Sequence, residues 1–214
     1  MLEPDVTITD YLLCLECVVL AWWCARRHAT AYGWYVAFFI SLSVASALGG
    51  TMHGFVPDGG GAVVLWLGVL LSIGATAVTM WGIVVSLCLT PGAARVAMSV
   101  VAVLAVLYIW TVMGVVREFW ITIVAYMPAA LAMLVAYVLN RRAGGGEVLR
   151  WGIAGVALTF VAAIVQVGRV ALHPHWFNHN ALYHTIQAVA LLAIAVAAGA
   201  RLGKSDGDRH AAGQ

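Results

Sequence analysis

Apolar and polar positions fall into long blocks along the chain. Runs of about 20 apolar residues, the length that crosses a bilayer as a helix, recur from end to end. Short segments rich in Gly, Pro or Arg separate them, among them PDGGG at 57–61, RRAGGG at 141–146 and HPH at 173–175. The pattern predicts seven membrane-spanning helices, at Ile8–Arg26, Tyr32–His53, Ala62–Leu89, Ala93–Gly114, Glu118–Asn140, Val148–Leu172 and Asn178–Leu202.

Composition agrees with an all-α, seven-helix membrane bundle that forms a single domain over residues 1–202. Of the 214 residues 64% are hydrophobic and 9% charged, whereas soluble domains carry about 25% charged residues. The start, MLEPDVTITD, lacks the basic segment of a signal peptide, and we expect it to be retained. Residues 203–214 are polar, and we expect a disordered cytoplasmic tail.

The distribution of basic residues predicts the orientation. With the N-terminus outside, only Arg117 and Arg169 lie on the outer side. The other nine of the eleven basic residues lie on the cytoplasmic side, as the positive-inside rule requires: Arg26, Arg27, Arg95, Arg141, Arg142, Arg150, Arg201, Lys204 and Arg209. This sorting by side, with a net charge of +2, favours a multi-pass protein of the cell membrane, in a bacterium the inner membrane. It gives no reason to expect a nucleic-acid partner.

Histidines gather on the predicted outer side. His53 ends the second predicted helix beside Gly49 and Gly50, which permit close approach of a neighbouring helix. The segment HPHWFNHNALYHTIQ, residues 173–187, contains four of the seven histidines. Within it Asn180, His184 and Gln187 stand at i, i+4 and i+7, so we expect them to share one helix face and to point into the bundle.

Two charged residues are expected at similar depth on this side. Glu16 lies about two turns into the first predicted helix, and Arg169 lies one turn before the end of the sixth. Because a lone charge facing lipid is costly, we expect the two to form a buried pair.

Imidazoles beside carboxylate and amide groups are suited to a zinc site. A catalytic zinc ion has three protein ligands and an open position for water, which it converts to a nucleophile. We expect His53, His179 and His184 as the Zn²⁺ ligands. Glu16 and Asn180 are the expected catalytic groups, with Asp10 as an alternative to Glu16 for general base or orienter. We expect His173 and His175 to remain at the membrane interface.

These motifs resemble the CREST superfamily of seven-helix membrane proteins, which includes alkaline ceramidases and progestin and adiponectin receptors. ALGGTMHGF (47–55) is similar to the family's Ser-x-x-x-His at the end of helix 2, with His53 as ligand and Gly49 at the serine position. HNALYHTIQ (179–187) is similar to its His-x-x-x-His, with His184 as the second histidine and Asn180 at the position of the first. The resemblance implies a zinc-dependent hydrolase of lipid amides or esters.

Three functions remain open from sequence. The first is this zinc-dependent lipid hydrolase, acting on a membrane lipid at the outer leaflet. The second is a non-enzymatic, receptor-like bundle that binds a lipid or small molecule in a polar pocket. The third is a haem protein with His53 and His184 as axial ligands, which ranks last because no C-x-x-C-H motif occurs.

Overall fold

The computed structural model describes residues 1–27, 31–56, 59–144, 146–173 and 176–199. His28, Asp58, His175 and the expected tail at 203–214 therefore lie outside the described residues. Within these ranges the chain forms seven helices, each long and apolar enough to cross a membrane, so the protein is a multi-pass, all-helical membrane protein. The helices are α1 (Pro4–Arg27), α2 (Tyr32–Phe55), α3 (Gly60–Cys88), α4 (Pro91–Gly114), α5 (Phe119–Arg142), α6 (Leu149–Val167) and α7 (His179–Ala198).

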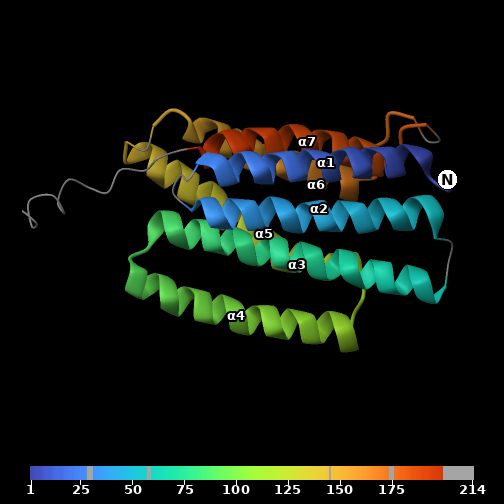
Figure 1. The fold of residues 1–214 in the computed structure, drawn as a ribbon, viewed down its shortest axis with the longest axis horizontal. Coiled ribbons are helices and arrows are strands. Elements are labelled where there is room, and N and C mark those ends of the chain that lie inside the picture. The colour runs from blue at the N-terminus through green and yellow to red at the C-terminus, as the bar shows by residue number, and fades with distance from the viewer. Residues whose placement is uncertain (28–30, 57–58, 145, 174–175, 200–214) are drawn as a thin grey trace, which may run out of the picture.

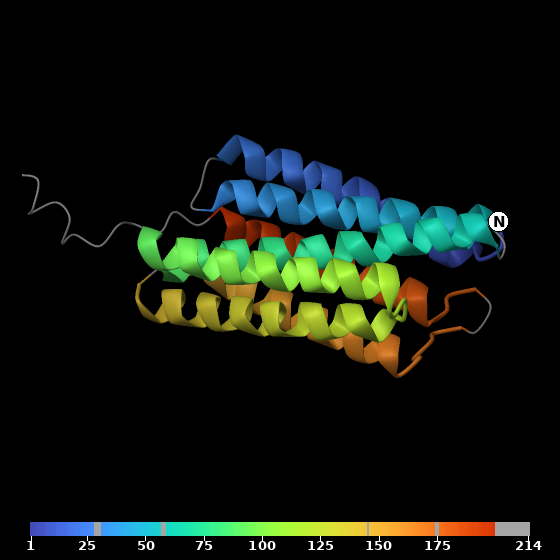
Figure 2. The same ribbon diagram turned by 90° about the horizontal axis from the view of Figure 1, so that it is seen from below.

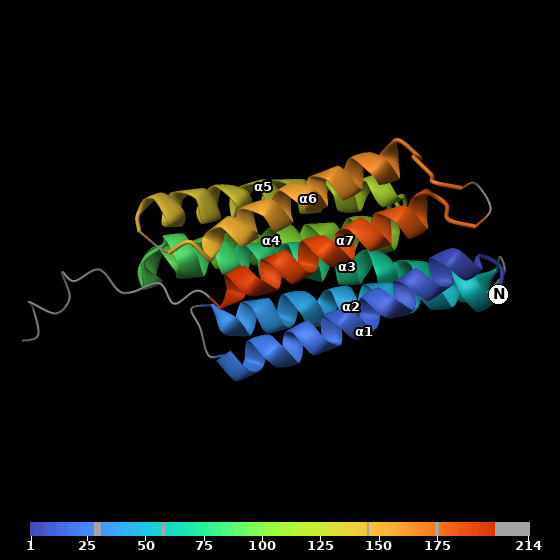
Figure 3. The same cartoon turned by 90° about the horizontal axis from the view of Figure 1, so that it is seen from above.

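Six of the helices form a closed bundle. The neighbours in this closed ring are, in order, α1 and α2, α2 and α3, α3 and α5, α5 and α6, α6 and α7, and α7 and α1. Helix α4 contacts chiefly α3 and lies at the edge of the molecule in Figure 1, so that it faces the viewer in Figure 2, which is seen from that side. Helices α1, α3, α5 and α7 begin where α2, α4 and α6 end (Figure 3). We call this the N-terminal end of the bundle, and the opposite end the arginine end.

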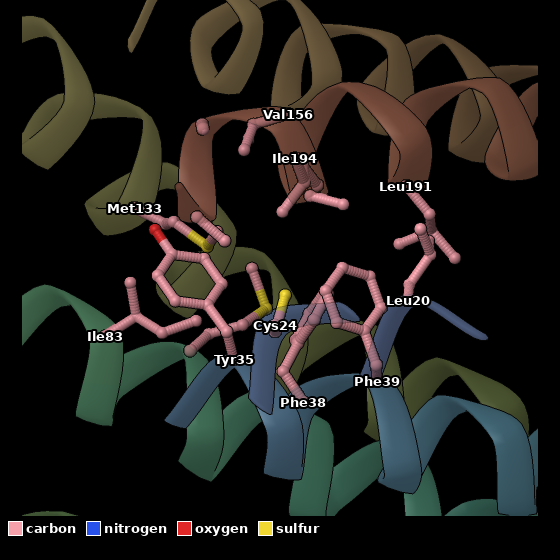
Figure 4. Close-up of a cluster of buried hydrophobic side chains, with 14 of the residues drawn as sticks. Leu20, Cys24, Tyr35, Phe38, Phe39, Ile83, Met133, Val156, Leu191 and Ile194 are labelled. Carbon is pink, nitrogen blue, oxygen red and sulfur yellow. The ribbon is translucent and has the colours of Figure 1, made fainter. Parts of the chain in front are cut away.

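The buried core lies between the bundle helices, towards the arginine end. Figure 4 shows side chains from α1, α2, α3, α5, α6 and α7 meeting there, among them Phe38, Phe39 and Met133. Within this apolar cluster the hydroxyl groups of Tyr35 and Tyr137 hydrogen-bond to each other at 2.8 Å. The two buried phenols thereby satisfy one another and tie α2 to α5.

The main error in the predicted boundaries is the end of the sixth helix. It ends at Val167, five residues before the predicted Leu172. The N–H of Gly168 donates to the carbonyl of Ile164 at 2.8 Å, and Arg169 adopts the left-handed backbone conformation with φ 49°. This turn takes Arg169 out of the helix and leaves it exposed.

Candidate functional site

A buried contact joins α1 to α7 at the N-terminal end. The imidazole of His184 on α7 lies between two consecutive residues of α1: its Nδ1 is 3.1 Å from Thr9 Oγ1, and its Nε2 is 3.3 Å from Asp10 Oδ1. The His184 and Asp10 side chains are 12% and 6% exposed. We call these three residues the α1–α7 clamp. Because burying either partner alone is costly, each stabilises the other.

Two glycines of α2 let the α1 side of the clamp approach closely. A Cβ on Gly49 would lie 3.2 Å from Asp10 Oδ2, and one on Gly50 would lie 3.0 Å from Asp10 Cβ. Larger residues at these positions would displace the Asp10 carboxyl group. The close approach predicted from the Gly-Gly pair is confirmed, and the helix that approaches is α1.

Further polar contacts fasten the start of α1. His53 Nδ1 pairs with Glu3 Oε2 at 3.1 Å, and the Glu3 N–H donates to the His53 carbonyl. Asp5 Oδ2 accepts the backbone N–H of Asn178 at 3.0 Å. Asn178 in turn caps α7, since its side chain accepts the N–H groups of Asn180 and Ala181. The first turns of α1 are thus connected to the end of α2 and the start of α7.

The arrangement does not fit the expected three-histidine zinc site. Both ring nitrogens of His184 already have partners in Thr9 and Asp10, so neither is left for a metal ion. His53 pairs with Glu3, and His179 is the first residue of α7. Among the residues that the structure describes, no group of three or more His, Cys, Asp or Glu side chains could hold a metal ion. Zinc binding therefore stays a prediction that this geometry does not support.

The expected pair of Glu16 with Arg169 is wrong. Glu16 Oε1 is buried and has no hydrogen-bond partner among the described residues. Arg169 lies in the turn after α6, exposed, and pairs with no described carboxylate. The physical reason is the early end of α6, which puts the guanidinium group outside the helix.

Asn180, the other expected catalytic residue, joins two helices. Its Oδ1 accepts the Nε2–H of Gln166 on α6 at 2.7 Å. The three residues predicted to share one face of α7 therefore contact two different helices. Asn180 and Gln187 hydrogen-bond to α6, whereas His184 contacts α1.

A cavity of about 460 Å³ lies beside these contacts. Its wall comes mainly from α5, α6 and α7 at the N-terminal end, with one residue each from α2 and α3. The volume is that of a small-molecule site. Apolar residues dominate the wall, and no charged side chain contributes to it. Its polar members are Thr122, Tyr126, Thr159, Gln166, Tyr183 and Gln187.

The side-chain carbonyl oxygen of Gln187 has no hydrogen-bond partner among the described residues. Thr159 donates its hydroxyl hydrogen to the carbonyl of Gly155 at 3.1 Å, so it can only accept from Gln187. This assigns Gln187 Nε2 to the contact with Thr159 at 3.4 Å. Gln187 Oε1 is then buried with no hydrogen-bond partner among the described residues. Such an orphaned acceptor costs about 1–3 kcal/mol unless a ligand or water satisfies it.

Two tyrosines add free hydroxyl groups to the same wall. Neither Tyr126 nor Tyr183 hydrogen-bonds through its side chain to another described residue. Tyr183 also lies next to the clamp, with its ring centroid 5.2 Å from that of His184. The residues of the largely apolar wall thus include a glutamine whose buried carbonyl has no partner and two tyrosines whose hydroxyl groups have none among the described residues.

A second groove, of about 750 Å³ between α3, α4 and α5, lacks such groups. Thr79, Tyr108 and Thr111 line it, and each donates its hydroxyl hydrogen to a backbone carbonyl. Its hydroxyl groups are thus satisfied by backbone carbonyls of the same protein, which is typical of a surface that contacts hydrocarbon.

Sequence reasoning missed Thr9, Tyr126, Thr159 and Tyr183. A threonine or tyrosine inside an apolar run is common in membrane helices and gives no signal by itself. Asp10 did give a signal, because an ionisable residue within a span is functional or paired by default.

Comparison with known proteins adds the family. No curated protein and no solved structure matches the chain. Residues 6–203, which include the clamp and the whole cavity wall, match the family of unknown function DUF6962, and the chain belongs to that family.

Proposed function

We propose that this protein is a seven-helix, receptor-like membrane protein that binds a neutral amphipathic molecule in the cavity between α5, α6 and α7. The observation that carries the proposal is the apolar cavity of about 460 Å³ beside the unpartnered carbonyl of Gln187. A ligand hydroxyl or amide N–H would satisfy that carbonyl and recover the cost of burying it.

The wall also indicates the chemistry of the ligand. A charged headgroup would enter a cavity without a countercharge, which is strongly unfavourable. A fully apolar molecule would leave the Gln187 carbonyl and the hydroxyl groups of Tyr126 and Tyr183 unsatisfied. A lipid-like molecule with a hydroxyl group and a carbonyl fits both conditions, and monoacylglycerol is a suitable probe of this class.

A cavity-filling substitution tests the proposal. We expect Ala163→Phe, in the cavity wall on α6, to reduce labelling by a photoreactive monoacylglycerol at least tenfold, because the new ring occupies the site. Ala157→Phe is the matched control, since Ala157 lies on the same helix and is exposed. A photoreactive fatty acid, which is anionic, should label the parent protein weakly. Equal labelling of both variants by the monoacylglycerol would contradict the proposal.

Replacing Gln187 by leucine should separate binding from stability. Leucine removes the acceptor, so monoacylglycerol affinity should fall about three- to tenfold, the contribution of one hydrogen bond. The same change removes an orphaned buried carbonyl, so the unfolding temperature without ligand should stay the same or rise. Titration and thermal unfolding in detergent measure the two effects. Loss of stability with unchanged affinity would show that Gln187 is purely structural.

We also propose the N-out, C-in orientation, which would place the cavity in the outer leaflet. A C-terminal reporter that functions only in the cytoplasm should be active, and one that functions only outside the cell should be silent. The reverse pattern would move the cavity to the inner leaflet.

The zinc content of the purified protein distinguishes the ligand-binding proposal from zinc-dependent hydrolysis. The ligand-binding proposal expects less than stoichiometric zinc in the purified protein and no cleavage of the bound monoacylglycerol. Stoichiometric zinc that is lost on replacing His53 or His184 would favour the hydrolase instead.

A further inference from the structure

The last turns of α1 carry two tryptophans and two arginines in the sequence WWCARR, residues 22–27. The Arg26 guanidinium lies 4.1 Å from the ring centroid of Trp22, and that of Arg27 lies 3.8 Å from Trp23. Each arginine therefore stacks on the tryptophan one helical turn before it. We call these four residues the Trp–Arg pair of stacks.

The stacks have a defined place at the arginine end. A Cβ on Gly199, which follows α7, would lie 3.3 Å from Arg27 Nη1 and 3.7 Å from the Trp23 ring. Arg27 and Trp23 thus pack against the end of α7. Trp22 and Arg26 are exposed on the outside of α1, where tryptophan takes the level of the lipid headgroups.

Both guanidinium groups remain without a countercharge within the described residues. The acidic side chain described at this end is Glu147, which pairs with Arg141 at 3.2 Å and Arg150 at 3.6 Å. Stacking restrains a guanidinium group but leaves its N–H donors free. The guanidinium groups of Arg26 and Arg27 are adjacent, restrained and at the level of the lipid headgroups. Their N–H groups are therefore suited to hydrogen-bond the oxygens of a phosphate group.

We propose that the Trp–Arg pair of stacks binds the phosphate of an anionic phospholipid. The tryptophan rings contact the glycerol and upper acyl region, and Arg26 and Arg27 share the phosphodiester. This site is independent of the cavity, because it lies at the opposite end of the bundle. The occupant is a lipid rather than free phosphate, since only a lipid also contacts the exposed Trp22 ring.

Native mass spectrometry in mild detergent tests the site with phosphatidylglycerol and phosphatidylcholine as probes. We expect the parent protein to retain phosphatidylglycerol in preference to phosphatidylcholine. The double variant Arg26→Gln/Arg27→Gln should bind it at least tenfold more weakly, because each guanidinium group would lose its charge-assisted hydrogen bonds to the phosphate, on the order of tenfold for each. Arg26→Lys/Arg27→Lys should show a smaller but clear loss, since lysine keeps the charge without the planar fork.

The matched control is Arg95→Gln/Arg142→Gln, which removes two exposed arginines of the same end that are not stacked on tryptophan. It should retain the phosphatidylglycerol binding of the parent. Equal losses in both double variants would show diffuse attraction and overturn the site. Displacement of phosphatidylglycerol by excess inorganic phosphate would overturn the assignment to a lipid.

Discussion

Replacing His184 by alanine is expected to lower the free energy of unfolding by about 3 kcal/mol, because it leaves the buried Asp10 carboxyl group without its partner. Equilibrium unfolding in mixed micelles measures the loss. Asp10→Asn in the same background should recover part of it, since the amide removes the uncompensated charge.

His53→Ala provides the matched control. His53 also pairs with a carboxylate at the N-terminal end, but the side chains of His53 and Glu3 are 26% and 45% exposed. A pair this open to solvent contributes about 0–1 kcal/mol, so the loss should be small. A shared zinc site would instead make the two histidines equivalent. Equal losses for His53→Ala and His184→Ala would contradict the clamp.

The second large effect is expected from Gly155→Ala at the α6–α7 contact. The new Cβ would lie 2.6 Å from the carbonyl oxygen of Ala190 and 3.0 Å from the backbone nitrogen of Ile194. Backbone atoms cannot move aside as a side chain can, so the two helices must separate. We expect a loss of about 1–3 kcal/mol, together with weaker monoacylglycerol binding, because α6 and α7 form much of the cavity wall.

Gly33→Ala is the control for this substitution. Gly33 lies in the first turn of α2, where a Cβ would meet nothing within 4 Å. Alanine is the better helix former by about 0.5–1 kcal/mol, so stability should be unchanged or slightly higher. A Gly155→Ala protein as stable as the parent would show that the α6–α7 contact is looser than described.

The seven helices could be predicted from sequence because each requires only a long apolar run between breakers. The end of α6 could not, because Gly168 and Arg169 are followed by the apolar residues 170–172, which extend the hydrophobic pattern. The left-handed backbone conformation at Arg169 does not change the hydropathy of the segment, so the hydrophobic pattern could not indicate it.

It was harder to predict which side chains contact each other within the site. The depth of a residue in the membrane does not specify the direction in which its side chain leaves the helix. Asp10 and Glu16 are six residues apart on α1, which places them about 120° apart around the helix. Sequence reasoning gave the central polar role to Glu16, whereas Asp10 is the carboxylate that faces α7. That choice depends on the rotation of α1 against α2, where Gly49 and Gly50 admit Asp10.

The cavity could not be predicted at all. It depends on side chains from five helices and on the assignment of one amide group, which rests on the hydrogen bond from Thr159 to Gly155. Gln187 was recognised as an inward-facing polar residue, but its unsatisfied carbonyl emerges only from the packing of α6 against α7.

The most direct test is to map where a photoreactive monoacylglycerol cross-links to the protein in lipid nanodiscs. Peptide mass spectrometry should place the labels on the cavity wall, at Phe119–Met127 of α5, Thr159–Gly168 at the end of α6 and Tyr183–Gln187 of α7. Excess unlabelled monoacylglycerol should compete for these positions. Labels confined to the lipid-facing surface of α4, and unaffected by competitor, would contradict a ligand site in the cavity.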